Sequence, residues 1–174
     1  VPIALLLVVA IIALAIWLRH GGGETFPNRT GPPTMGADDL ELVAALPRPP
    51  GNVAVSRDGR VFFTFHPDGK PEIKVAEWVD GEARAYPDMA FQSERDELWF
   101  DAPLSLRIDA NNHLWVLDQA NHGSGDAKLV AIDLATDQVI REHHFTSDQA
   151  GLGSHLNDFQ VHPSGDRVYI AEAS

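Results

Sequence analysis

One unit occurs three times in the sequence, and this repeat restricts the possible folds more than any other feature. The copies are GNVAVSRDGRVFFTF from Gly51, LSLRIDANNHLWVLD from Leu104 and NDFQVHPSGDRVYIAE from Asn157. Equivalent apolar positions at Val55, Ile108 and Val161 lie 53 residues apart. Each copy is an alternating apolar run, a polar turn and a second run rich in β-branched and aromatic residues, which is the pattern of a β-hairpin.

A second predicted hairpin follows each of the first two copies, with strands at 73–78 and 82–86, and at 128–133 and 138–145. Four strands in about 50 residues form the blade of a β-propeller. The predicted fold class is therefore all-β, a β-propeller, with blades at about 51–100, 104–156 and 157–174. A propeller needs at least about four blades to close, so we expect these two and a half blades to be an incomplete propeller from a longer chain.

The N-terminal segment 1–20 is an apolar run of 18 residues ending in Arg19-His20. This length reaches the lower limit for a membrane-spanning helix. Two interpretations remain open: a signal peptide cut near Ala15, or an uncleaved N-terminal membrane anchor. Either one predicts export, to the periplasm, the extracellular space or the outer face of the cytoplasmic membrane. Residues 21–39 are predicted to be a flexible linker, and the segment Leu40 to Leu46 a short strand or one helical turn.

Composition excludes several classes of partner and chemistry. The chain has 25 acidic and 13 basic residues and a formal net charge of −12. Such a surface repels nucleic acid, and we expect membrane contact only through the N-terminal segment. The absence of cysteine excludes disulfides, thiolate metal sites and a cysteine nucleophile. The sequence has none of the common hydrolase, zinc-protease, phosphate-loop or dinucleotide motifs, so whether it is an enzyme stays open.

Polar residues at equivalent ends of the repeats are the candidate ligand-binding set. In a propeller the innermost strands begin around one central channel. The candidates are Asn52, Ser105 and Asn157 at strand starts, Asp118 and Glu172 at ends of second strands, and Gln119 and His155 in neighbouring loops. Their amides, carboxylates and hydroxyl suit an amine or a divalent cation such as calcium. The alternative is that each residue caps its own strand or turn through the backbone.

Several of these segments resemble the yellow and major royal jelly protein family. They are PPGNVAVSRDGRVFFTF, LRIDANNHLWVLDQ, KLVAIDLATDQVIREHHF and LNDFQVHPSGDRVYIAEAS, in order over about residues 47–174. The chain is more distantly similar to the gluconolactonase and regucalcin group. The resemblance implies an exported six-bladed propeller with a ligand pocket at the channel mouth. Insect members have disulfides, so the absence of cysteine indicates a bacterial-type member.

Three functions are compatible with this sequence. The first is binding of a small-molecule ligand, an amine, a catechol or a sugar-like compound, at the central channel. The second is a metal-dependent lactonase or hydrolase, in which the likeness implies that Asn157 is a metal ligand. The sequence has no acidic residue between Leu46 and Gly51, where that group places its first ligand, and this weakens the second function. The third is that the chain has no function by itself, because residues 168–172 would form an unpaired sheet edge.

Overall fold

The computed structural model describes residues 2–21, 27–94 and 98–174, which divide into two compact units at Glu41 and Leu42. The first unit contains helix α1 (Pro2–His20) and the short helix η1 (Ala37–Asp39). Helix α1 begins with proline at a position where its missing N–H is not needed, and continues in apolar helix formers. Among the residues described, no helix is both long enough and apolar enough to cross a membrane.

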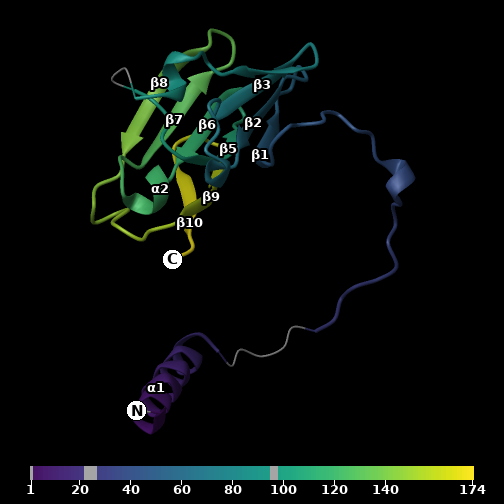
Figure 1. Ribbon diagram of the computed structural model, residues 1–174. Helices are drawn as coiled ribbons and strands as arrows, with labels where there is room; N and C mark the ends of the chain where they lie inside the picture. Colours follow the sequence, from purple (N-terminus) through teal and green to yellow (C-terminus); the bar gives the residue numbers. More distant parts are fainter. Residues whose placement is uncertain (1, 22–26, 95–97) are drawn as a thin grey trace. The chain divides into compact units, whose positions relative to one another are not determined.

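The second unit consists of three antiparallel sheets (Figure 1). The first has the order β1 (Pro50–Val55), β2 (Val61–Phe65), β3 (Val75–Val79) and β4 (Glu82–Ala85). The second has the order β5 (Pro103–Ile108), β6 (His113–Asp118), β7 (Lys128–Asp133) and β8 (Gln138–His144). The third pairs β9 (Leu156–Val161) with β10 (Val168–Glu172). Short helices η2 (Pro67–Gly69), η3 (Ala90–Gln92) and α2 (Ala120–Gly123) lie in the connections.

This succession of four, four and two strands, each pairing with the next, confirms the predicted all-β fold of a partial propeller. The equivalent pairs Val53 with Phe63 and Leu106 with Val116 show that the 53-residue repeat is also a repeat of strand register. The hairpin turns place Gly59, Asn112 and Gly165 at positive φ. Glycine and asparagine are the residues that tolerate this conformation best, so the turn sequences determine where each hairpin reverses.

The predicted strand or helical turn at Leu40 to Leu46 is wrong, because this segment has no regular structure. Leu40, Leu42 and Val43 are all exposed. The alternation of apolar residues predicts a regular segment, but these three side chains neither pack on a sheet nor cover a core. Only Leu46 packs, against the side chains of Phe63 and its neighbours on the first sheet.

The sheets pack face to face through two apolar clusters. Phe62 and Phe100 meet Leu106 and Val116 between the first and second sheets. Between the second and third sheets the cluster contains Trp115, Leu117, Leu156 and Phe159. Face-to-face packing of successive sheets brings the beginnings of β1, β5 and β9 to one end, where β5 contacts both of the other strands.

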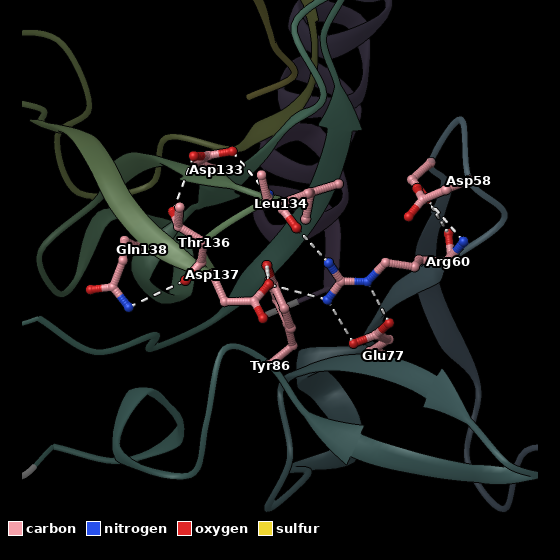
Figure 2. A network of polar contacts seen from close by, with 11 residues as sticks. Asp58, Arg60, Glu77, Tyr86, Asp133, Leu134, Thr136, Asp137 and Gln138 are labelled. Atoms are coloured by element: carbon pink, nitrogen blue, oxygen red, sulfur yellow. Dashed lines mark hydrogen bonds and ion pairs between the residues drawn. The ribbon is translucent and has the colours of Figure 1, made fainter.

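A polar network centred on Arg60 ties the first sheet to the second (Figure 2). Its Nε and Nη2 donate to Glu77 at 2.7 and 3.0 Å, and its Nη1 donates to the carbonyl of Leu134 at 2.7 Å. Its Nη2 also contacts Asp137 Oδ1 at 3.1 Å, which accepts the Tyr86 hydroxyl at 2.7 Å. Hydrogen bonding to Glu77, chiefly, raises the pKa of Arg60. The network therefore connects charges of both blades through one guanidinium.

Tyr86 should make stability fall at high pH, since burial, and then its hydrogen bond to Asp137, raise its pKa. A raised folded-state pKa gives stability that is fully present below the ordinary tyrosine pKa, about 10, and is lost as the pH rises above it. Tyr86→Phe is therefore expected to lower the free energy of unfolding by about 1 kcal/mol at neutral pH. Above pH ~10 the free energy of unfolding of this variant should fall less steeply than that of the wild type. Urea unfolding at several pH values measures both effects.

The other tyrosine, Tyr169, is 56% exposed and provides the matched control. Tyr169→Phe should change the free energy of unfolding by less than about 0.5 kcal/mol and keep the wild-type slope at high pH. Equal slopes in the wild type and the Tyr86→Phe variant would contradict the assignment of the alkaline transition to Tyr86.

Candidate functional site

A cavity of about 440 Å³ lies at the end of the sheets where the inner strands begin. Its volume lies in the range of small-molecule sites, about 300–1,000 Å³. Its walls are Gly51, Asn52, His66, Asp68, Leu104, Gln119, His122, His155, Asn157 and Asp158. Four of the seven predicted ligand-binding residues therefore line this cavity: Asn52, Gln119, His155 and Asn157.

The Arg107 guanidinium connects the three inner strands beside this cavity. Its Nη1 donates to Asn52 Oδ1 at 2.9 Å on β1, and its Nη2 donates to Asp158 Oδ2 at 2.5 Å on β9. Ser105 on β5 is buried, and its hydroxyl donates to Asp158 Oδ1 at 2.6 Å. One arginine therefore connects polar side chains of three blades.

Asp158 and Arg107 are the site residues that sequence reasoning missed. The repeat spacing of 53 leads from Asn52 to Ser105 and then to Asp158, so Asp158, and not Asn157, is the register equivalent. The signal for Asp158 was therefore present in the repeat. Arg107 had no such signal, because Ala54 occupies the same repeat position in the first copy.

Arg107→Gln should weaken the junction of the three inner strands. The pair with Asp158 is partly exposed, with 25% and 44% of the side chains accessible, so we expect a loss of about 1 kcal/mol in the free energy of unfolding. Urea denaturation measures this loss. Arg167→Gln removes an exposed contact to Asp166 and serves as the control, with a change within about 0.5 kcal/mol. An equal effect of the two variants would show that the junction contributes nothing specific.

The loop after β6 has an unusual backbone and lines the cavity. Ala120, Asn121 and His122 have φ values of 50°, 50° and 59°, and Gly123 follows at 69°. A residue other than glycine in this left-handed region costs about 1–2 kcal/mol. At Gly123 a Cβ atom would lie 2.1 Å from the carbonyl oxygen of Gly151, so no other residue fits. Strained segments of this kind are concentrated at binding and catalytic sites.

His122 and His155 meet across the cavity wall with ring centroids 5.0 Å apart, edge to face. The carbonyl of His122 accepts a hydrogen bond from the Gly153 N–H at 2.8 Å. Glu172 is exposed and accepts the backbone N–H of His155 at 2.7 Å, a bond that lowers the pKa of Glu172. The predicted candidate Glu172 therefore holds the loop that carries His155 and does not line the cavity.

Asp118, also a predicted candidate, is completely buried beneath the strained loop. Its carboxylate accepts the backbone N–H groups of Asp101 at 2.6 Å, and of Ala102 and Ala120 at 2.9 Å. Lys128 Nζ lies 3.5 Å from it. Burial raises the pKa of Asp118, and the nearby ammonium and the three N–H groups oppose that shift. Asp118 thus shapes the loop by accepting hydrogen bonds from backbone N–H groups.

A second cavity of about 530 Å³ shares Asp68, Gln119 and His122 with the first. It lies between the β2–β3 connection and the segments around β5 and the loop after β6. Its remaining walls are Phe65, Pro67, Lys70, Pro71, Lys74, Asp101, Ala102, Pro103 and Asn121. Gln119 belongs to both cavities, is only 4% exposed, and its side-chain oxygen has no hydrogen-bond partner in the described part of the chain.

The structure gives Asn157 no cluster of ionisable metal ligands among the described residues. Over residues 2–21, 27–94 and 98–174 no group of three or more His, Asp or Glu side chains is arranged to hold a metal ion. His122, His155 and Asp68 lie around one cavity but are not such a group.

Comparison with known proteins supports a family resemblance. No curated protein matches the chain. The sequence model of the family described as "Major royal jelly protein" matches residues 102–174. This match confirms the resemblance carried by the LWVLD, KLVAIDL and YIAE segments. Over the second sheet and the third hairpin, residues 102–174, the chain is similar to the major royal jelly protein family.

Proposed function

We propose that this protein is an exported propeller that binds a small molecule carrying an amine in the cavity of about 440 Å³. The observation that supports the proposal most is the composition of the wall. Its polar side chains are three amides, three imidazoles and two carboxylates, contributed by the beginnings of the inner strands and the loops beside them. A small set of converging polar groups in a concave site is typical of small-molecule recognition.

The charges of the wall favour a cation over an anion. Its two carboxylates are Asp68 and Asp158, and the described wall contains no lysine or arginine. Asp158 already accepts hydrogen bonds from Arg107 and Ser105. The Asp68 side chain is 86% exposed, so it is the carboxylate that we assign to the ligand ammonium. The formal net charge of −12 adds a long-range attraction for cations.

The neutral wall groups suit the remainder of an amine, catechol or sugar-like ligand. The amides of Asn52, Gln119 and Asn157 offer donors and acceptors for hydroxyl groups. The rings of His122 and His155 offer an aromatic surface against which a catechol ring could pack. The ligand class that uses every part of the wall is therefore an aromatic amine with hydroxyl groups.

Calorimetric titration with phenethylamine, dopamine, catechol and glucose tests the proposal. We expect dopamine to bind best, and Asp68→Asn to weaken its binding about fivefold, the effect of an exposed ion pair of about 1 kcal/mol. Asp148 is exposed and outside both cavities, so Asp148→Asn is the matched control and should bind as the wild type does. Absence of binding heat with all four compounds would overturn the proposal.

Export is supported by the apolar composition of α1 and the glycine-rich and proline-rich segment that follows it. The test is fractionation of cells that express the protein with its own N-terminal segment. Recovery from the periplasm, the medium or the membrane supports export, and N-terminal sequencing of the recovered protein distinguishes a cleaved signal from an anchor. Recovery from the cytosol alone would contradict it.

A further inference from the structure

Two lysines share the ring of Trp99, and one of them, Lys74, lines the cavity of about 530 Å³. Lys74 Nζ lies 4.8 Å from the centre of the Trp99 ring, and Lys128 Nζ lies 5.5 Å from the same centre. Lys74 also donates a hydrogen bond to the carbonyl of Phe100 at 2.5 Å. These contacts orient the Lys74 amine and place a second positive charge near it.

The two lysines differ in how they are compensated. Lys128 is 2% exposed, and its Nζ donates to the Asp126 carbonyl at 3.0 Å and lies 3.5 Å from Asp118. Lys74 is half-buried and lines the cavity. Lys128 is therefore enclosed as part of the loop support, whereas Lys74 is the amine that a bound molecule can contact.

The pKa of Lys74 lies below its ordinary value. Burial is the main cause that lowers its pKa, and the charge of Lys128 acts in the same direction, while Asp101 and Asp118 oppose it. Partial desolvation and a neighbouring cation are the surroundings by which proteins increase the nucleophilicity of a lysine amine. Phe65, Pro71 and Pro103 provide apolar wall for the carbon skeleton of a bound molecule.

We propose that Lys74 is an amine nucleophile that forms an imine with an aldehyde or ketone bound in this cavity. The lone pair of neutral Nζ attacks the carbonyl carbon, a C–N bond forms, and the carbonyl oxygen takes up a proton to give a carbinolamine. Loss of the hydroxyl with one amine hydrogen releases water and leaves a C=N bond. The step needs no oxidant or reductant, and it does not depend on amine binding in the neighbouring cavity.

Reductive trapping tests the proposal, and the lysine content makes it simple to interpret. The chain has three lysines: Lys70, which is exposed, Lys74, and Lys128, which is buried. Treatment of the folded protein with benzaldehyde and cyanoborohydride at neutral pH converts each imine into a stable benzylamine. Peptide mass mapping then reports the label on each lysine. We expect Lys74 to carry more label than Lys70 at early times, and Lys128 to carry the least.

Two conservative variants complete the design. Lys74→Arg keeps a long side chain over Trp99 and a donor for the Phe100 carbonyl, so it should fold but lose the preferred label. Lys70→Arg is the matched control at the same cavity and should leave labelling of Lys74 unchanged. Circular dichroism verifies the fold of both variants. Labelling of Lys74 no faster than of Lys70 in the wild type, or the same total label in Lys74→Arg, would overturn the proposal.

Discussion

Asp118→Asn is expected to lower the free energy of unfolding by about 3–5 kcal/mol, the cost of removing one partner of a buried ion pair. Lys128, 2% exposed, would lose the carboxylate that lies 3.5 Å from its ammonium. Asparagine also replaces one carboxylate oxygen with an NH₂ group. This donor would face a backbone N–H donor, because both oxygens of Asp118 accept hydrogen bonds. Total stabilities of domains are about 5–15 kcal/mol, so the variant should unfold at far lower urea concentration.

The double variant Asp118→Asn with Lys128→Met distinguishes the two causes. It removes the isolated buried charge but leaves the mismatched amide, so it should recover part of the lost free energy of unfolding. Urea unfolding monitored by circular dichroism measures all variants. A loss below about 1 kcal/mol for Asp118→Asn would mean that the carboxylate does not hold the loop, and would return Asp118 to the candidate ligand contacts.

Arg60→Met is expected to lower the free energy of unfolding by about 2–3 kcal/mol, since hydrogen bonds to charged groups contribute about 1.5–3 kcal/mol each and are not additive. Methionine keeps apolar contact with Phe62 and Tyr86, whose ring centres lie 4.9 and 5.5 Å from the guanidinium carbon. It loses every donor to Glu77, Asp137 and the Leu134 carbonyl. Glu77, 16% exposed, is then left without its cation.

Arg84→Met provides the control, because Arg84 contacts Asp80 at 3.3 Å on the surface, with 57% and 82% of the side chains accessible. Surface pairs contribute about 0–1 kcal/mol, so this variant should stay close to the wild type. Arg60→Lys should fall between wild type and Arg60→Met, since lysine cannot bind Glu77 and the Leu134 carbonyl with one planar fork. Equal stability of Arg60→Met and Arg84→Met would show that the blades are held by apolar packing alone.

Much of the fold could be predicted because each hairpin is encoded locally. Alternation and turn residues indicated the strand pairs, and the observed strands begin or end within two residues of the predicted ranges, as at Lys128–Asp133. The segment from Leu40 failed for the opposite reason, since its apolar residues have no partner strand, and pairing is not a local property.

The candidate site could be predicted only where the repeat itself carries the information. Asn52, Gln119, His155 and Asn157 lie around one cavity because strand starts and the loops beside them converge. Arg107 lies two residues after Ser105 on β5, and its long side chain reaches Asn52 and Asp158. No spacing rule indicates such a reach, because it depends on the distance between neighbouring blades.

The left-handed loop could not be predicted either. In the segment Gln119 to Gly125 the sequence signals are its two glycines, whereas the residues that depart from ordinary backbone geometry include Ala120 and His122. Alanine has no local preference for this conformation. The Asp118 carboxylate and the close approach of Gly123 to Gly151 impose it, and both are tertiary contacts.

The equivalent positions Asn52, Ser105 and Asp158 carry an amide, a hydroxyl and a carboxylate, while the next residues, Val53, Leu106 and Phe159, are all apolar. In the second and third copies the apolar residue, Leu106 or Phe159, is buried between sheets, whereas the polar residue before it takes part in the junction at Arg107. Substitutions at the polar position therefore act on the junction that Arg107 makes between the inner strands. The repeat thus assigns inter-blade polar contacts and core packing to neighbouring residues, so that a point mutation can alter one without replacing the other.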